Sequence, residues 1–357
     1  MLEPRADRRL STPARQRMVA ILCVLAFIVA LLLGGCQSPL KPATAAPPRS
    51  EILPLGWLQA LTGRTPEPAD LVQSDPASTD LTTTEPESES PVVNASAAEG
   101  YPVARWLNNE KLIPSNDRDW IDEHKVLPTA EFAGDLVTVH NVRNAEWLTA
   151  VDCIVERNDR TYNLKDLQSL DFVVVPFENK TIAHTMLSFG FGQGTYLGVS
   201  AEVRVEKGEG YNAALGVARQ FELTYVLADE HDLLPVRVKH RKADVYIYRT
   251  TATALQSQKM FKDVVARVNQ LAKTPEFYDT LSNNCTTNIV RHVNALSPNR
   301  VPYDARVLLP GYADHLAYEL GLLDQRLPFQ EIKRRAWSND RIVKYENRPD
   351  FSARIRK

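Results

Sequence analysis

The most constraining feature of the sequence is a stretch in which two apolar runs flank three closely spaced glycines. It reads HTMLSFGFGQGTYLGVSAEVR and covers residues 184–204. The glycines surround Gln193 and predict a turn between two strands. If the chain reverses direction at Gln193, His184 lies opposite Glu202. The stretch therefore predicts an antiparallel hairpin with a defined register.

In this register, each strand of the hairpin has one apolar and one polar face, because successive side chains point to opposite sides of a strand. The apolar face consists of Leu187, Phe189, Leu197, Val199, Ala201 and Val203. The polar face consists of His184, Ser188, Ser200, Glu202 and Arg204. A shift of one residue would pair apolar with polar side chains, so the pattern favours this register. We predict that Ser200 and Arg204 are binding residues beside the histidine.

The pair of His184 and Glu202 has the composition of a catalytic base and its partner. Cross-strand neighbours have Cβ atoms about 5 Å apart. A carboxylate at that distance can accept a hydrogen bond from one imidazole nitrogen and fix the tautomer, which leaves the other nitrogen free to act as a base. The alternative is an ordinary exposed His–Glu pair on a solvated sheet face.

The order of strand-like and helical segments indicates the fold class. Strand-like runs come first, separated by Gly, Asp and Asn turns: DLVTVHNVRN, SLDFVVVPF, IAHTMLSFGF, TYLGVSAEVRVE, FELTYVLAD, LLPVRVKH and ADVYIYRT. A helical period follows in TALQSQKMFKDVVARVNQLAK, which places Phe261, Val264, Val265 and Val268 on one face. Strands followed by helices predict an α+β domain with a mainly antiparallel sheet.

The segment DTLSNNCTTNIVRHVN predicts a helix whose first turn contains Cys285. Asn283 or Asn284 can cap this helix, and we also predict Asn284 as a binding residue. Free backbone N–H groups and the positive end of the helix dipole favour a thiolate at this position. The same N–H groups could receive the oxyanion of an attacked carbonyl. Cys285, His184 and Glu202 together have the composition of a thiol acyl-transfer site.

Other residues leave alternatives open. His292 lies two helical turns after Cys285, about 10 Å along the axis and too far for direct proton transfer, so we interpret it as structural. His140 remains a rival base. His231 lies in an acidic cluster that we interpret as a charged strand end. Cys153 could form a disulfide with Cys285, which would exclude a catalytic thiol.

The N-terminal segment predicts export. Five arginines precede an apolar run at residues 18–33, which is shorter than the ~20 residues of a relaxed membrane span. The run ends in Leu33-Gly34-Gly35-Cys36, which resembles a bacterial lipobox. We predict a signal peptide at 1–36, lipidation at Cys36 and, because Gln37 follows, an outer-membrane lipoprotein facing the periplasm. The alternative is an uncleaved transmembrane anchor.

Composition divides the rest of the chain. Residues 37–100 are rich in Pro, Ser, Thr and Glu and predict a disordered linker. Residues 101–330 predict the folded domain, and 331–357 a basic, solvated tail. The net charge of −2 gives no field that would gather nucleic acid, so we exclude that role. No metal site with convincing spacing is found, and no cofactor is expected.

The motifs from SNDRDWI through VHNVRN, IAHTMLSFGF, YLGVSAEVR, FELTYVLADE, VYIY and NNCTTNIVRHVN resemble the Lnb N-terminal periplasmic domain family. The resemblance implies a circularly permuted papain-like (NlpC/P60-like) thiol enzyme. It also implies lipoprotein N-acyltransfer through a cysteine thioester. In this resemblance Cys285 matches the nucleophile, His184 the base and Glu202 the conserved acidic position. The family enzyme carries membrane spans beyond this domain, whereas this chain has no second long apolar run.

Three functions follow as hypotheses. The first is a thiol acyltransferase or acyl hydrolase acting on lipid-linked or amide substrates, held to membrane lipid through acylated Cys36. The second is an amidase or peptidase on cell-wall peptides that uses the same residues. The third is a non-catalytic binding lipoprotein in which Cys285 is oxidised to Cys153.

Overall fold

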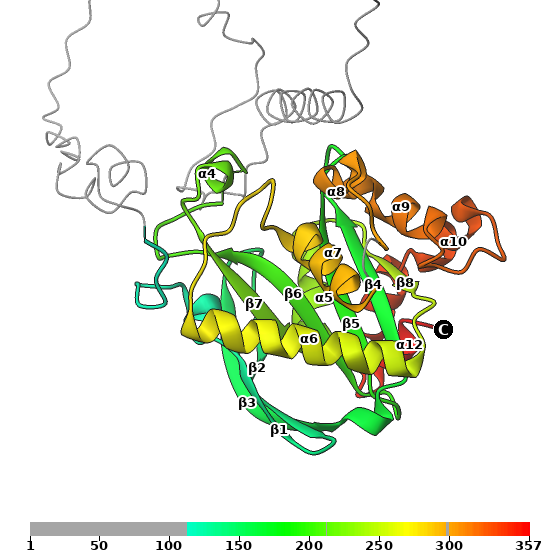
Figure 1. Cartoon of the computed structure of the whole chain (residues 1–357), viewed down its shortest axis with the longest axis horizontal. Helices are drawn as coiled ribbons and strands as arrows, with labels where there is room; N and C mark the ends of the chain where they lie inside the picture. Colours follow the sequence, from blue (N-terminus) through cyan, green and yellow to red (C-terminus); the bar gives the residue numbers. More distant parts are fainter. Residues whose placement is uncertain (1–112, 212, 298–299) are drawn as a thin grey trace, which may run out of the picture. The chain divides into compact units, whose positions relative to one another are not determined.

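The computed structural model describes residues 113–211, 213–297 and 300–357 as one α+β domain built on a mostly antiparallel sheet (Figure 1). The predicted fold class is confirmed. The leader at 1–36 with Cys36 and the linker at 37–100 lie outside the described residues.

Eight strands form the sheet in the order β1-β2-β7-β6-β5-β4-β8, and β3 pairs with β2. The pairing of β2 with β7 is parallel, and the other pairings are antiparallel. The strands are β1 (Thr129–Ala133), β2 (Leu136–Trp147), β3 (Cys153–Asn163), β4 (Ser169–Pro176), β5 (Ala183–Gly190), β6 (Tyr196–Arg204), β7 (Glu222–Ala228) and β8 (Tyr246–Arg249).

Helices follow the main strands in the chain, as the sequence pattern predicts. The α-helices are α4 (Ala213–Val217), α5 (Glu230–Pro235), α6 (Ala254–Lys273), α7 (Cys285–Leu296), α8 (Ala305–Leu308), α9 (Ala313–Glu319), α10 (Phe329–Ala336), α11 (Asn339–Tyr345) and α12 (Phe351–Arg354). Short 3-10 turns are η3 (Asp122–His124), η4 (Leu164–Asp166) and η6 (Pro310–Tyr312), and η5 (Val236–His240) is a π-helix.

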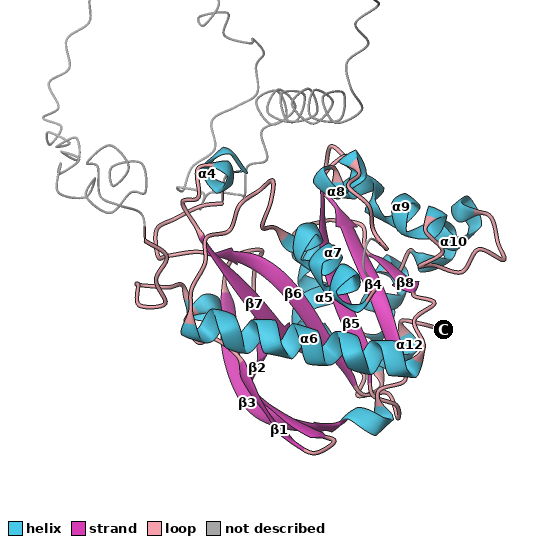
Figure 2. Ribbon diagram, viewed as in Figure 1, coloured by secondary structure: helices cyan, strands magenta, loops and turns pink. Residues whose placement is uncertain are grey.

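Hydrophobic cores cover both faces of the sheet. One core joins the apolar hairpin face to α6, whose predicted stripe of Phe261, Val264, Val265 and Val268 is buried in it. Helices α6 and α7 lie in front of the strands in Figure 2. The second core packs α5, α11 and α12 against the opposite face, through Leu233, Ile342 and Phe351. The polar face of the hairpin is therefore covered by protein, because α5 packs on it.

One predicted strand is wrong. The run LLPVRVKH alternates like a strand, but it forms the end of α5 and the π-helix η5. Leu233 and Leu234 are buried in the second core and Val238 packs against it, while Arg237 donates to the carboxylate of Glu202. Tertiary packing overrides the local period here. The helical turn of η5 brings Arg237 to the carboxylate of Glu202.

The predicted solvated tail is also wrong. Residues 331–357 form most of α10, together with α11 and α12. Ile342, Phe351 and Ile355 are fully buried in the second core. These few apolar residues anchor a segment whose many basic side chains suggested a free terminus.

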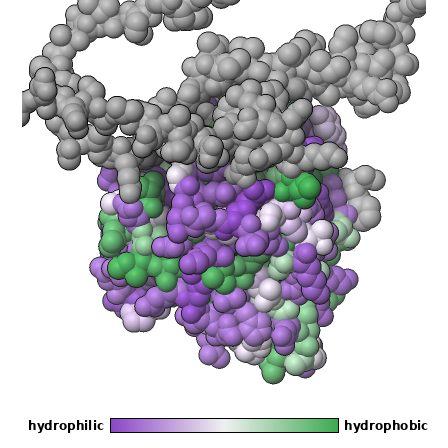
Figure 3. Space-filling view, turned by 90° about the vertical axis from the view of Figure 1, so that its left-hand side faces the viewer, coloured by the Kyte–Doolittle hydropathy of each residue, from purple (hydrophilic) through white to green (hydrophobic). Residues whose placement is uncertain are grey.

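The surface is mixed. Figure 3 shows one side of the molecule, where hydrophilic side chains predominate and apolar side chains form separate groups among them. Among the described residues, no helix combines the length and the apolar character that a membrane crossing requires.

The packing of the C-terminal helices gives a test of stability. Phe351→Ala should lower the free energy of unfolding by about 3–5 kcal/mol, because it leaves a cavity in the second core. Val343→Ala on neighbouring α11 is the control, because Val343 is 53% exposed and its truncation should change stability by less than about 0.5 kcal/mol. Urea denaturation measures both. Equal stability of the two variants would show that the C-terminal segment does not pack.

Candidate active site

The hairpin has the predicted register, but its ladder is shorter than expected. Leu187 pairs with Val199, and Gly190 pairs with Tyr196. The β5–β6 pairing ends at Leu187, although β5 begins at Ala183 and β6 continues to Arg204. The strand ends that carry His184 and Glu202 are therefore not paired through their backbones. This leaves backbone groups of β5 available to a third element.

That third element is the first turn of α7. Thr286 and Thr185 of β5 share a hydrogen bond of 3.0 Å between their hydroxyl groups. Asn284 caps the helix: its side chain accepts from the Thr287 N–H at 2.9 Å, and the Thr287 hydroxyl accepts from the Asn284 N–H at 2.8 Å. This reciprocal capping box fixes where the helix begins. Cys285 is therefore held as its first residue, against β5.

Cys285 and His184 interact directly. Burial acts to raise the pKa of the Cys285 thiol, but the charge of His184, a hydrogen bond to it and a hydrogen bond from the Thr185 backbone outweigh burial and lower the pKa to about 7. Burial acts to lower the pKa of His184, but the charge of Cys285 and hydrogen bonds to Cys285 and Glu202 raise it. Each group thus stabilises the charged form of the other, as in a thiolate–imidazolium pair.

Ser200 connects the histidine to its carboxylate. The Nε2 atom of His184 lies 2.6 Å from the Ser200 hydroxyl, which donates to Glu202 Oε1 at 2.7 Å. The direct distance from His184 Nε2 to Glu202 Oε1 is 3.5 Å. Because Ser200 donates onward, it accepts from Nε2–H, and Nδ1 is left for the thiol. We predicted Ser200 as a binding residue; the structure places it as a bridge that orients the ring.

Glu202 is buried and ionised. Burial acts to raise its pKa. Hydrogen bonds to His124 and His184, together with the charge of Arg237, outweigh burial and hold the pKa well below its ordinary value. Arg237 Nη2 donates to Glu202 Oε1 at 3.1 Å, and His124 Nε2 lies 3.8 Å from Oε2. The side chains of His184 and Glu202 are only 16% and 17% exposed, which excludes the alternative of a solvated surface pair.

Two site residues were missed from the sequence. Arg237 lies in the run that we interpret as a strand. His124 lies 60 residues before His184, in a segment where the sequence shows no motif. His124 is held by accepting the Val205 N–H on Nδ1 at 3.1 Å. The signal that could have found them is the charge of Glu202. A carboxylate on a covered strand face needs a cationic or hydrogen-bonding partner.

Arg204 does not reach the site. Its guanidinium donates to the carbonyl groups of His124 and Lys125 and to Asn116 Oδ1, and it stacks over Trp120. Arg204 therefore fastens the segment before β1 to the hairpin. Asn284 contributes the helix cap and a bond from its amide to the Thr280 carbonyl. The structure thus gives both side chains a role within the fold, and their roles in binding a substrate stay predictions.

The other histidines have partners elsewhere. His292 is buried between Asp263 at 2.6 Å and the Tyr225 hydroxyl at 2.8 Å, in agreement with a structural role. His140 on β2 bonds Asp159 at 2.7 Å. His231 packs against Phe351 on the second core. Of the described histidines, those that contact Glu202 are His184 and His124.

Both described cysteines are free thiols, so the disulfide considered from the sequence is absent. Cys153 begins β3, opposite Trp147. Burial, aided by the charge of Glu123, raises the pKa of Cys153 to about 12. The two thiols therefore differ in their ionisation: that of Cys285 ionises near neutral pH, and that of Cys153 stays protonated.

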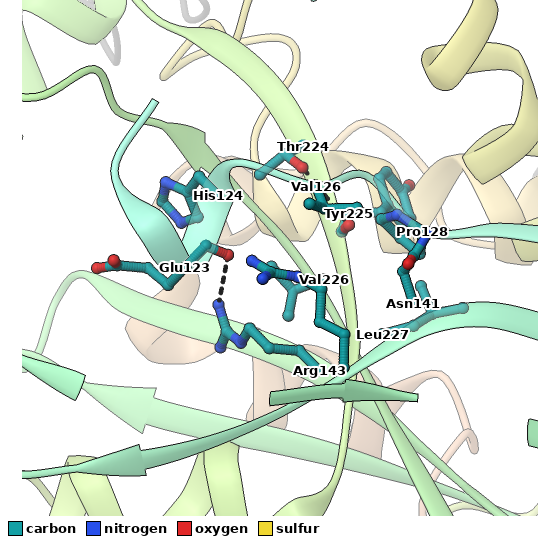
Figure 4. A pocket seen from close by; sticks show the side chains of 11 residues that line it. Glu123, His124, Val126, Pro128, Asn141, Arg143, Thr224, Tyr225, Val226 and Leu227 are labelled. Atoms are coloured by element: carbon teal, nitrogen blue, oxygen red, sulfur yellow. Dashed lines mark hydrogen bonds between the residues drawn. The ribbon is translucent and has the colours of Figure 1, made fainter. Parts of the chain in front are cut away.

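A small cavity lies beside His124 and is also lined by Arg143, Asn141 and Tyr225, among others (Figure 4). The Nη1 atom of Arg143 donates across it to the Glu123 carbonyl at 3.4 Å. Its volume is about 10 Å³, on the scale of one water. It is too small for a substrate.

The comparison with protein families agrees with this geometry. Residues 155–311 match the model of the Lnb N-terminal periplasmic domain. The chain carries an Lnb N-terminal periplasmic domain. The match includes His184, Ser200, Glu202 and Cys285, so all four lie within the family domain. The resemblance inferred from the motifs is confirmed, and the domain is one of the cell envelope.

No curated protein matches the chain. No solved structure matches it either.

The contrast between the two thiols can be measured by alkylation. Below pH 9, iodoacetamide should label Cys285 and leave Cys153 almost untouched, because only the thiolate reacts. The labelling rate of Cys285 should reach half its maximum near the pKa of about 7. In His184→Asn this midpoint should rise, because the cationic partner is lost while burial remains. Peptide mass spectrometry at each pH reports both sites. Faster labelling of Cys153, or an unmoved midpoint in the variant, would contradict the site.

Proposed function

We propose that this envelope domain is a cysteine-dependent acyl-transfer enzyme, with Cys285 as nucleophile and His184 as general acid and base. The observation that carries the proposal is the contact of a thiol of lowered pKa with an imidazole that a buried carboxylate orients through Ser200. A nucleophile, a base and a group that orients the base are the parts required for covalent acyl chemistry.

Cys285 and His184 can carry out each bond exchange and proton transfer of the reaction. The Cys285 thiolate attacks the carbonyl carbon of an acyl ester, and the bond to the leaving oxygen breaks as that oxygen takes the proton of the His184 imidazolium. A thioester forms on Cys285. An acceptor amine then attacks the thioester, His184 takes the amine proton, and the thiolate leaves. Ser200 and Glu202 hold the ring in one orientation through both steps.

The start of α7 supports the oxyanion of these steps. The first N–H groups of a helix have no partners within it and point outward at the positive end of the dipole. Cys285 is the first helical residue, so the attacked carbonyl lies next to these donors. Donors fixed before the reaction stabilise charge that develops in the transition state.

The burial of the thiol favours transfer over hydrolysis. Only 7% of Cys285 is exposed. A thioester formed there has little contact with bulk water, so a bound amine competes well for it. The substrate class follows from the resemblance: a lipid-linked acyl group as donor and an amine as acceptor. Lipidation at Cys36 would hold the domain at the membrane that supplies the donor, on the periplasmic side of the outer membrane.

Trapping the intermediate tests this function. The full chain in uncharged detergent is incubated with a phospholipid that carries a labelled acyl chain, and no amine is added. We expect a fatty-acyl mass on the peptide that contains Cys285, removable by hydroxylamine. Cys285→Ala should abolish it. Cys153→Ala, the matched control, should leave it unchanged, because Cys153 lies outside the site.

The same measurement contains the outcomes that would overturn the proposal. A peptide mass on Cys285 after incubation with cell-wall peptides would assign the site to amide cleavage. Acyl transfer that persists in Cys285→Ala would exclude the thiol mechanism altogether.

The role of Glu202 gives a separate prediction. Glu202→Gln should lower kcat/KM on the order of 10²–10⁴-fold, because the imidazolium loses its buried counter-charge. Since Glu202 raises the pKa of His184, the variant should lower that pKa and move the alkaline limb of the pH profile toward lower pH. Rates of acyl transfer across pH measure the shift. A uniform loss with an unmoved profile would mean that Glu202 only supports the fold.

A further inference from the structure

A second cavity, separate from the thiol site, lies among arginines of the C-terminal helices. It has a volume of about 100 Å³. Four guanidinium groups line it, from Arg249 at the end of β8, Arg335 on α10, Arg341 on α11 and Arg356 after α12. These side chains come from four elements and surround the space from several sides.

The cavity lies away from Cys285. Asp171 of β4 forms one wall and pairs with Ser188. Ser188 lies four residues along β5 from His184, which corresponds to about 13 Å in a strand. The cavity therefore contributes nothing to the acyl-transfer chemistry proposed above.

Carboxylates balance only part of this charge. The two carboxylate oxygens of Asp171 form ion pairs with Arg249 and Arg356, each at 2.7 Å. Arg356 also bonds Glu230. Arg335 is 62% exposed and bonds Glu331 at 2.6 Å. Each of these arginines has an acidic neighbour.

Arg341 has a different environment. Its Nη2 donates to the carbonyl groups of Arg335 and Trp337 and to the Ser338 hydroxyl. In the described part of the chain no carboxylate lies within ion-pair distance of it, and its Nε is buried without a hydrogen-bond partner. A buried donor of a charged group without an acceptor is costly. Because no described carboxylate offsets the charge of Arg341, the cavity keeps positive charge that favours a ligand carrying negative charge.

We propose that this cavity binds a phosphate group. Guanidinium donors match the oxygens of phosphate, and four of them arranged around one space suit a tetrahedral oxyanion better than a flat carboxylate. The volume is well below the ~300 Å³ of pockets that enclose whole small molecules. The cavity therefore recognises one phosphate group, either of free inorganic phosphate or of a phospholipid headgroup.

Calorimetric titration of the full chain tests the site, in uncharged detergent and phosphate-free buffer. One arm uses inorganic phosphate, and the other uses dihexanoyl phosphatidylglycerol below its micelle concentration. Arg341→Gln should weaken binding about tenfold or more, because a charged hydrogen-bond donor is lost. Arg249→Gln should do the same and is informative even if the first variant does not fold. Lys344→Gln, which removes an equal charge from the exposed side of α11, should leave binding unchanged.

Each outcome decides the proposal. Tighter binding of the phospholipid assigns the site to a headgroup, and equal or tighter binding of inorganic phosphate assigns it to phosphate itself; both need the arginines and support the site. Absence of saturable binding in either arm, or equal affinities of the wild-type chain and both folded arginine variants, overturns it.

Discussion

The ionised carboxylate of Glu202, buried between a strand and a helix, is the interaction on which the site depends. A buried charge is stable only where it is paired and hydrogen-bonded. Arg237, Ser200 and His184 meet that need at Oε1, and His124 lies at Oε2. Contact with Glu202 holds each of these partners in place, so the ring of His184 has one orientation. That orientation turns its second nitrogen to Cys285 and lowers the thiol pKa. The lowered pKa of the sulfur thus depends on the charge of Glu202, which lies two residues before the end of β6.

The end of the β5–β6 ladder makes room for this arrangement. Had the pairing continued past Leu187, the backbone of Thr185 would bond to β6, and the start of α7 would be shut out. Because it stops there, the Thr185 backbone donates to the sulfur instead, and its hydroxyl bonds Thr286. A sheet that opens at one end can hold a helix N-terminus in the gap, so the backbone groups of strand and helix are satisfied together.

Much of this was predictable because hairpin register and helix caps are local. The glycine turn at Gln193 indicated which residues face each other, and Asn283 and Asn284 as candidate caps placed the start of α7 to within one residue. Partners from distant segments were not predictable in this way. Arg237 sits in a run whose alternation imitates a strand, and nothing near it indicates a carboxylate 35 residues away. Phe351 and Ile355 are too sparse to predict a packed helix, yet they anchor the C-terminal segment. Arg204 has the right face and charge for a site, but its partners come from the segment before β1, which no local pattern reveals.

The state of the two cysteines follows from the same physics. An oxidising compartment drives thiols to disulfides, and the thiolate is the form that reacts. Cys153 stays protonated because its pKa is raised to about 12. Cys285 ionises readily but is only 7% exposed, so it can admit a small reagent while the thiols of other proteins reach it poorly. Burial alone would suppress the thiolate, and the imidazolium alone would leave it open to oxidation. Together, the imidazolium and the burial give Cys285 a lowered pKa and little contact with solvent.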